Sequence, residues 1–403
     1  MPISNYTSLV RTFFSRRAGT LTLFVTSRCN ARCRMCFNWK NLEDSAKREE
    51  LSIEEIEKIA EGFRGLHSLI VSGGEPFLRE DLKEIIGAFH GLSGVRHVSI
   101  PTNLFLGNAP EMIKDMAAGY PKVFFRILMS LDGVGIDHDA IRNHPGGFQK
   151  LLQNYERLCA YKKELKNLSL NVAVVLSSYN REKIGALLDF AGTLDVDDIK
   201  LIYVRGDTRE KGAKDVEPQA YRNAIKRAEL LTVKKKRTKS FYNNLFSSAS
   251  LVAKEIIAES LIEKKLPFPC NAGKRFLVIS DTGEVFPCET MGKELGNLRK
   301  ENYSIRAIME SEKAKAVLRF IKEGRCFCTM DCNTISNVIY SPSLYPRVFK
   351  KLLDFYREKL FRARAPIRRA CPALDAGMGR GRVFLRSSPF RIASASLYQP
   401  RVL

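Results

Sequence analysis

The sequence has no apolar run long enough to cross a membrane. Its first strand-like stretch, Leu21 to Val25, is closed by Arg28, whereas a membrane helix needs about 18 apolar residues in succession. Arg16 and Arg17 resemble a twin-arginine export signal, but no long apolar stretch follows them. We therefore expect no transmembrane segment and a cytoplasmic location.

The sequence also lacks the evenly spread cysteine pairs of a disulfide framework. Most of its ten cysteines fall in two groups, which indicates metal ligation in a reducing compartment. A chain of 403 residues can bury one large α/β core and a smaller one without covalent cross-links.

Acidic residues are scarce compared with basic ones. There are 44 Asp and Glu against 66 Lys and Arg, a formal charge of +22, which is compatible with nucleic acid, an acidic substrate or an anionic surface. Residues 362–401 hold nine Arg and a single acid, Asp375, so the rest of the chain is less basic than the total. The sequence contains no basic motif interleaved with aromatic residues, which is the pattern that would indicate RNA binding. We expect this tail to be disordered and dispensable, because it has little apolar surface to bury.

Cys29, Cys33 and Cys36 form a C-x3-C-x2-C pattern directly after the first strand-like stretch. Three thiolates this close in sequence can bind one iron-sulfur cluster and leave one iron of a cubane open. A structural zinc ion takes four N or S ligands, and no further Cys or His occurs before His67. The pattern therefore favours a cluster with an open iron, which points to chemistry rather than to a structural role.

A second motif, Ser72-Gly73-Gly74-Glu75-Pro76, follows the apolar run Leu69 to Val71. With the cysteines after the first strand and Gly-Gly-Glu-Pro after the second, the chain resembles the radical S-adenosylmethionine (radical SAM) enzymes. The resemblance implies that the three cysteines hold a 4Fe-4S cluster whose open iron binds S-adenosylmethionine (AdoMet). Gly73 and Gly74 would let the backbone approach the methionine amino group, and Glu75 would contribute to the same site.

Strand-like and helix-like segments alternate from about residue 20 to about residue 205, which predicts an α/β fold of parallel strands with crossover helices. The expected strands are Leu21 to Val25, Ser68 to Val71, His97 to Ile100, Val123 to Met129, Ser169 to Leu176 and Lys200 to Val204. Ser52 and Glu55 form a capping-box pattern at the start of one helix. The resemblance implies that these units make an incomplete, open (β/α)6 barrel.

Polar residues follow several of these strands, where parallel barrels gather their chemistry. Ser130 and Asp132 belong to a Ser-Leu-Asp-Gly segment, which in the resembling enzymes lies beside the AdoMet ribose and methionine. Asp139, Arg142 and Pro145-Gly146 follow it, as in the subfamily that carries auxiliary clusters. The further candidate AdoMet ligands are Asn103 and Arg205. For each residue taken singly, a loop cap or turn is the alternative.

The second cysteine group surrounds a predicted hairpin in which Asp281-Thr282-Gly283 is the turn. Its members are Cys270, Cys288, Cys326, Cys328 and Cys332. This pattern resembles the Twitch or SPASM extension, which binds auxiliary 4Fe-4S clusters. Five cysteines permit one fully ligated cluster and a spare, so we expect a Twitch-like single site. A four-cysteine zinc hairpin is the alternative.

The predicted organisation is an N-terminal segment (1–19), a radical SAM partial barrel (20–215), a helical bridge (216–265), a Twitch/SPASM-like domain (266–345) and a C-terminal helix with the basic tail (346–403). The resemblance implies reductive cleavage of AdoMet to a 5′-deoxyadenosyl radical, which abstracts hydrogen from a substrate. It also implies a reductant such as flavodoxin or ferredoxin. A peptide substrate is favoured from subfamily frequency alone. The alternatives are a small-molecule dehydrogenase and a non-catalytic iron-sulfur or zinc scaffold that binds RNA.

Overall fold

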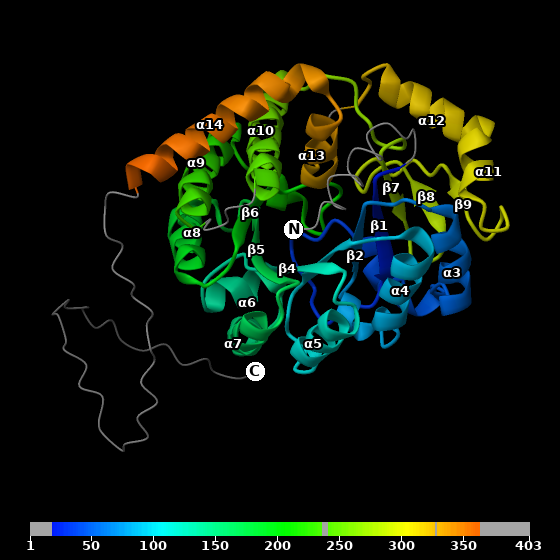
Figure 1. Cartoon of the computed structure of the whole chain (residues 1–403), viewed down its shortest axis with the longest axis horizontal. Helices are drawn as coiled ribbons and strands as arrows, with labels where there is room; N and C mark the ends of the chain where they lie inside the picture. The colour runs from blue at the N-terminus through cyan, green and yellow to red at the C-terminus, as the bar shows by residue number, and fades with distance from the viewer. Residues whose placement is uncertain (1–17, 236–240, 327–328, 363–403) are drawn as a thin grey trace, which may run out of the picture. The chain divides into compact units, whose positions relative to one another are not determined.

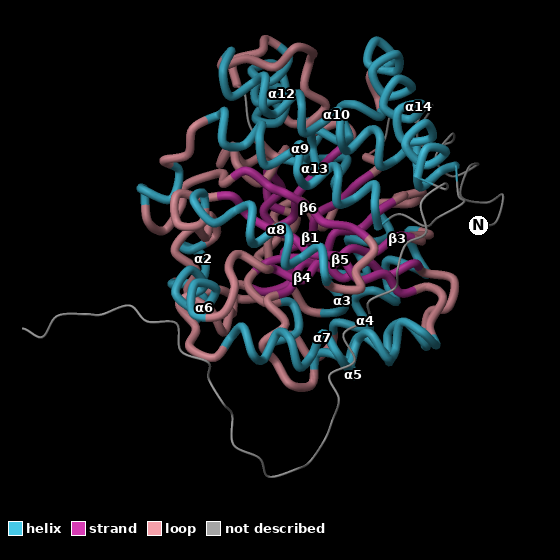
Figure 2. Tube along the Cα trace, turned by 90° about the vertical axis from the view of Figure 1, so that its left-hand side faces the viewer, coloured by secondary structure: helices cyan, strands magenta, loops and turns pink. Residues whose placement is uncertain are grey.

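The computed structural model describes residues 18–235, 241–326 and 329–362, and one sheet of nine strands lies at its centre (Figures 1 and 2). The strands are β1 (Thr20–Thr26), β2 (Ser68–Gly73), β3 (His97–Thr102), β4 (Phe124–Ser130), β5 (Leu168–Leu176), β6 (Asp198–Tyr203), β7 (Phe276–Ile279), β8 (Glu284–Phe286) and β9 (Gly296–Asn297). Their order is β6-β5-β4-β3-β2-β1-β7-β8-β9. Strands β1 to β6 pair in parallel, so the predicted open, six-unit parallel architecture is confirmed.

Helices connect the parallel strands, as the alternating sequence pattern predicts. They are α2 (Trp39–Glu43), α3 (Ile53–Gly62), α4 (Leu82–Ala88), α5 (Ala109–Gly119), α6 (Ile136–Arg142), α7 (Gly147–Glu164) and α8 (Ile184–Thr193). The capping box at the start of α3 is confirmed: the Ser52 hydroxyl accepts from the Glu55 backbone N–H at 3.3 Å, and the Glu55 carboxylate accepts from the Ser52 N–H at 2.8 Å. Both bonds satisfy donors that a helix start otherwise leaves unpaired.

Side chains alternate between the two faces of each strand, and β4 shows how the two faces differ. Phe125, Ile127 and Met129 are completely buried in the main apolar core. Arg126 and Ser130, on the other face, line an internal cavity. The neighbouring strands also present small or polar side chains to this cavity: Thr20, Ser68, Ser99, Ser169 and Asn171. A closed barrel of this type is filled by bulky side chains, whereas here the inner face leaves open space.

The C-terminal part covers the inner face and extends the sheet. Its helices are α9 (Pro218–Lys235), α10 (Phe241–Glu263), α11 (Ile305–Glu310), α12 (Glu312–Lys322), α13 (Asp331–Ile339) and α14 (Tyr345–Arg362). Helices α10 and α13 lie side by side (Figure 1) and share an apolar cluster that includes Val252, Ile256 and Val338. Residues from α10, α13 and α14 line the cavity opposite the strands.

The predicted hairpin is present as the antiparallel pair β7 and β8. Strand β7 also pairs in parallel with β1, with Thr20 opposite Phe276, so the hairpin continues the barrel sheet. The sequence did not predict this pairing, because register between strands so far apart in the chain is set by tertiary packing. None of the described helices combines the length and apolar character that crossing a bilayer requires. The N-terminal segment before residue 18 and the basic tail after Arg362 lie outside the described residues.

Candidate functional site

Cys29, Cys33 and Cys36 lie in the loop that follows β1, and all three are partly buried. The backbone N–H of Arg34 in this loop donates to the carbonyl of Ile141 at 3.0 Å. The Arg34 guanidinium also pairs with Glu210, with an Nε–Oε1 distance of 2.9 Å. The loop is therefore held from α6 on one side and from the segment after β6 on the other.

Gly73 and Gly74 bring the end of β2 into contact with the same loop. The Gly74 N–H donates to the Thr26 carbonyl at 2.7 Å. A Cβ added to Gly73 would lie 2.2 Å from the Thr26 carbonyl oxygen, and one added to Gly74 would lie 2.0 Å from that of Arg28. Gly73 has a φ of 133°, which side chains rarely tolerate. Backbone packing alone therefore requires both glycines, and their contact with AdoMet stays a prediction.

Glu75 connects the loops that follow β1, β2 and β3 through hydrogen bonds. It is buried, and its carboxylate accepts from the Thr102 hydroxyl and from the Asn103 N–H, both at 2.8 Å. Burial raises the pKa of Glu75 to about 7, although these donors act in the opposite direction. The Asn103 amide donates to the Asn30 side chain at 2.6 Å. Both predicted site residues thus hold the cysteine loop against the ends of β2 and β3.

Asp132 is completely buried and forms an ion pair with Arg142 at the end of α6. Its Oδ1 also accepts from the Val175 N–H at 2.7 Å. The Arg142 Nη1 donates to the Cys33 sulfur at 3.7 Å. Asp132 therefore acts on the cysteine loop through Arg142, while Ser130 lines the cavity. In the sequence Arg142 stands out only as part of a pattern, and nothing there predicts its contact with a cysteine.

The cysteine environment fits an iron-sulfur cluster. Burial raises the pKa of the Cys29 thiol to about 12 and that of Cys36 to about 11, so thiolates here need nearby positive charge, which cluster irons provide. In the described part of the chain, no three His, Cys, Asp or Glu side chains gather closely enough for a single metal ion.

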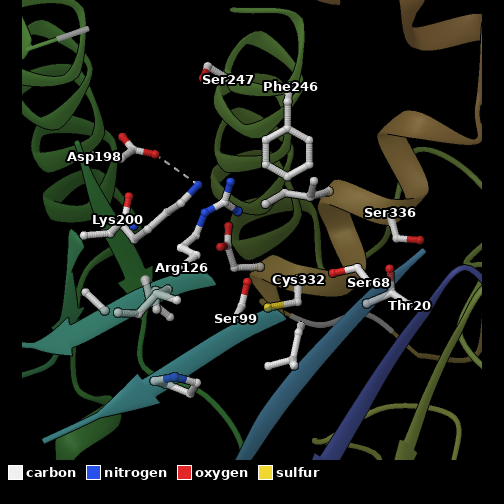
Figure 3. A pocket seen from close by; sticks show the side chains of 18 of the residues that line it. Thr20, Ser68, Ser99, Arg126, Asp198, Lys200, Phe246, Ser247, Cys332 and Ser336 are labelled. Atoms are coloured by element: carbon white, nitrogen blue, oxygen red, sulfur yellow. Dashed lines mark ion pairs between the residues drawn. The ribbon is translucent and has the colours of Figure 1, made fainter. Parts of the chain in front are cut away.

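A cavity of about 1170 Å³ begins at this loop. Cys33, Cys36 and Ser130 line it at the carboxyl ends of the strands, and it continues along the inner face to Thr20 and Ser68 at the amino ends (Figure 3). Pockets for small molecules and cofactors usually measure roughly 300–1,000 Å³. The cavity therefore has room for a cofactor of the size of AdoMet and for a substrate group.

Arg205 also lines this cavity, but its guanidinium is paired. Its Nη2 lies 2.7 Å from the Glu289 carboxylate, and both side chains are largely buried. The guanidinium carbon lies 5.3 Å from the centre of the Phe37 ring. Arg205 therefore connects the segment after β6 with the residue that follows Cys288, and its predicted contact with AdoMet stays a prediction.

The second cysteine group packs in an apolar cluster beside β7 that contains Cys270, Cys288, Cys326 and Cys332. The Cys270 sulfur accepts from the Asn333 amide at 3.1 Å. Burial raises the pKa of Cys326 to about 11, and the charges of Cys270 and Cys288 add to this effect. Cys332 differs, because it lines the cavity (Figure 3). Cys328 lies outside the described residues.

Three further side chains on the cavity wall were missed by the sequence analysis: Arg126, Lys200 and Phe246. Arg126 interrupts the otherwise apolar run from Val123 to Met129, and a cation within a predicted buried strand is a signal that could have been used. Lys200 occupies a similar place at the start of the predicted sixth strand. Phe246 carries no comparable signal, because an aromatic residue on a helix is usually core.

Two family models match the chain. The first, described as the Radical SAM superfamily, matches residues 23–191. The second, SPASM, described as an iron-sulfur cluster-binding domain, matches residues 270–333. The first match contains the three-cysteine loop and the Gly-Gly-Glu-Pro motif, and the second contains all five cysteines of the second group.

Curated relatives with different activities resemble the chain. An AdoMet-dependent heme synthase of Methanosarcina barkeri is 24% identical over 75% of this chain and 85% of its own length. A GTP 3′,8-cyclase of Lactiplantibacillus plantarum is 30% identical over 45% of this chain and 53% of its own length. The chain thus spans about half the length of that cyclase.

Solved structures share the fold. The structure of native anSMEcpe with bound AdoMet aligns with a TM-score of 0.54 and 17% identity, over 85% of this chain and 98% of that one. Streptococcus suis SuiB bound to S-adenosylmethionine gives a TM-score of 0.54 and 14% identity, over 79% of this chain and 71% of that one. SuiB bound to its precursor peptide SuiA gives 0.50 and 15%, over 79% and 68%.

Proposed function

Because the chain belongs to the radical SAM superfamily and carries a SPASM iron-sulfur cluster-binding domain, we propose that it cleaves AdoMet reductively and abstracts a hydrogen atom from a substrate in its cavity. These domains give it a 4Fe-4S cluster, AdoMet and an auxiliary iron-sulfur cluster as cofactors. The observation that carries the proposal is the position of the cysteine loop, where Cys33 and Cys36 line the cavity.

The cofactors supply the difficult chemistry, which is cleavage of AdoMet to a 5′-deoxyadenosyl radical. In this proposal Cys29, Cys33 and Cys36 bind the cluster. The Arg142 guanidinium, 3.7 Å from the Cys33 sulfur, orients that ligand and places positive charge beside it. Helices α10, α13 and α14 form part of the cavity wall, and such a wall limits the access of water to reacting groups.

The auxiliary cluster is proposed to use Cys270, Cys288 and Cys326, which act electrostatically on one another. The remaining ligand would come from Cys328 or Cys332. Hydrogen bonds to cluster sulfurs influence reduction potentials, so the Asn333 amide at 3.1 Å from the Cys270 sulfur is placed to tune this cluster. Such a cluster can accept the electron released when a substrate radical is oxidised.

We propose a peptide as the substrate and a flavodoxin or ferredoxin as the reductant. Structures of SuiB with the precursor peptide SuiA and of anSMEcpe with a Cp18Cys peptide share the fold of this chain, which supports a peptide. The second candidate is a small molecule, since the heme synthase and the GTP cyclases are named for small-molecule reactions.

The proposal is tested by anaerobic reconstitution followed by incubation with reductant and AdoMet. We expect 5′-deoxyadenosine from the wild type and none from the variant in which Cys29, Cys33 and Cys36 are all Ala. Cys159→Ala is the matched control, because this partly buried cysteine lies on α7 away from both groups. Undiminished 5′-deoxyadenosine from the triple variant would refute the cluster assignment.

Iron content gives a second measure in the same samples. We expect about eight irons per wild-type chain and about four in the triple variant, since each cubane contains four. Stoichiometric zinc with about four irons in the anaerobically isolated wild type would refute the iron-sulfur assignment of the second group. Deuterated candidate substrates then identify the substrate, because deuterium transferred to 5′-deoxyadenosine marks the hydrogen that is abstracted.

A further inference from the structure

Two cations meet on the cavity wall, away from the cysteine loop. Arg126 comes from β4 and Lys200 from β6, and both line the cavity. Figure 3 shows the Lys200 and Arg126 side chains extending from the strands toward Phe246. Bringing like charges together costs free energy unless a negative charge lies near both.

Phe246 of α10 covers this pair. The guanidinium carbon of Arg126 lies 5.5 Å from the centre of the Phe246 ring, and the Lys200 amine lies 5.8 Å from it. Both distances are within the range of cation-π attraction. The ring also gives the cavity an apolar surface directly beside the two cations.

Only one of these two cations, Lys200, pairs with a carboxylate of the described residues. Asp198 lies 3.3 Å from the Lys200 amine, which also donates to the Ser250 hydroxyl at 3.3 Å. Among the described residues, no carboxylate lies within ion-pair distance of Arg126. Lys254 adds a third, buried cation on α10. Burial lowers the pKa of Lys254, and the charge of Lys200 lowers it further.

Asp195 and Asp197 also line this cavity, and so does Asp331 at the start of α13. Asp331 acts electrostatically on Lys254 and on Arg205, but Arg205 already has Glu289 as its partner. Among the cations on the described cavity wall, Arg142, Lys200 and Arg205 each pair with a carboxylate, whereas Arg126 has none within ion-pair distance. A ligand carboxylate can supply the partner that the Arg126 guanidinium lacks.

We propose that this part of the cavity binds a carboxylate that is attached to an apolar group. Arg126 and Lys200 hold the carboxylate, and Phe246 packs against the apolar group. A guanidinium can form two parallel hydrogen bonds with a carboxylate, and at the partly buried Arg126 such an interaction is screened less than at an exposed site. That this ligand is the substrate rests on the proposed function.

The position of the subsite suits a substrate. One continuous cavity contains Arg126, Lys200 and Phe246 together with Cys33 and Cys36, so a molecule anchored at the cations can reach toward the cysteine loop. The carboxylate can belong to a peptide, as an acidic side chain, or to a small molecule. Both sources share the same chemistry at the anchor.

The test measures binding to the reconstituted holoenzyme by isothermal titration, with 3-phenylpropionate as the probe and 3-phenylpropionamide as its uncharged match. We expect the acid to bind at least tenfold more tightly than the amide. Arg126→Gln should weaken binding of the acid at least tenfold and that of the amide little. Arg96→Gln is the control, because this exposed cation precedes β3 and is not on the cavity wall; it should change neither.

A second arm separates the two sources of the carboxylate. The affinity for N-acetyl-Phe-Glu-amide is compared with that for N-acetyl-Phe-Gln-amide. The resulting ratio is then set against the ratio of affinities for phenylpropionate and its amide. A larger ratio for the peptides indicates that the ligand is a peptide. Iron content verifies that Arg126→Gln is folded. Three results would each overturn the proposed subsite: the wild type does not bind the acid, it binds acid and amide equally, or Arg126→Gln binds the acid as tightly as the wild type does. The binding assay does not depend on AdoMet cleavage, so failure of cleavage in the wild type would instead count against the proposed function.

Discussion

Replacing Arg142 with Met should destabilise the protein strongly, because it leaves a buried carboxylate without its partner. The Asp132 side chain is 0% exposed and that of Arg142 is 11% exposed. Asp132 would keep its hydrogen bond from the Val175 N–H at 2.7 Å but would lose the neighbouring positive charge. Removing one member of a buried ion pair typically costs about 3–5 kcal/mol.

The size of the effect follows from this cost. In domains of 150–250 residues, 1 kcal/mol shifts the unfolding midpoint by about 2–4 °C, so we expect Arg142→Met to lower the midpoint by roughly 6–20 °C. Asp132→Asn should have a similar effect, because it leaves the Arg142 charge buried. The double variant should be clearly less destabilised than the two single effects combined, because no unpaired charge remains.

The assay is anaerobic thermal unfolding followed by circular dichroism at one fixed scan rate, because iron-sulfur proteins do not unfold reversibly in two states. Arg227→Met is the matched control: it removes an Arg from an ion pair with Asp189 in which both side chains are 51% exposed, where pairs contribute little. Equal shifts for Arg142→Met and Arg227→Met, or strictly additive effects in the double variant, would refute the reasoning.

Two further predictions concern regions away from the cavity. The hydrogen bond from Arg299 lowers the pKa of Glu55 to about 2. Ionised Glu55 therefore stabilises the fold fully above its unfolded pKa of about 4.3, and this stabilisation is lost as the pH falls toward 2. We expect Glu55→Gln to lower the free energy of unfolding by about 1–2 kcal/mol near neutral pH and by progressively less in acid. The exposed Glu57→Gln control should not change between the two conditions, and a pH-independent loss in Glu55→Gln would contradict the ion-pair explanation. Truncation before Arg362 should leave iron content and AdoMet cleavage unchanged, whereas loss of either means that the tail belongs to the folded enzyme.

The parallel strands could be predicted from the sequence because each is a short run of apolar residues between clear turn signals. The predicted fifth strand, Ser169 to Leu176, differs from β5 (Leu168–Leu176) by one residue. The predicted fourth, Val123 to Met129, is offset by one residue from β4 (Phe124–Ser130). These are local properties of the chain. The pairing of β7 with β1 is not local, and no residue in either strand indicates its partner.

The candidate site was predictable to the level of residue types but not of contacts. Cysteine spacing indicated Cys29, Cys33 and Cys36 as cluster ligands, which stays a prediction, and the last two of them line the cavity. The role of Arg142 depends on α6 returning toward the cysteine loop, where the Ile141 carbonyl accepts from Arg34. The packing of α6 sets this return. Cys33 and Arg142 are 109 residues apart, and nothing in that spacing predicts their contact.

The Gly-Gly-Glu-Pro motif shows why a motif does not assign roles to its residues. In this structure Gly73 and Gly74 admit the Thr26 and Arg28 carbonyls, and the Glu75 carboxylate is occupied by Thr102 and Asn103. A motif whose main role is to fix three loops relative to one another has the same sequence as one whose side chains contact a ligand directly. Because holding the loops also fixes where the cysteines lie, loss of the motif would disturb cofactor binding even if none of these side chains touches AdoMet. Only variants that keep the loop bonds and alter the cavity surface can separate the two roles.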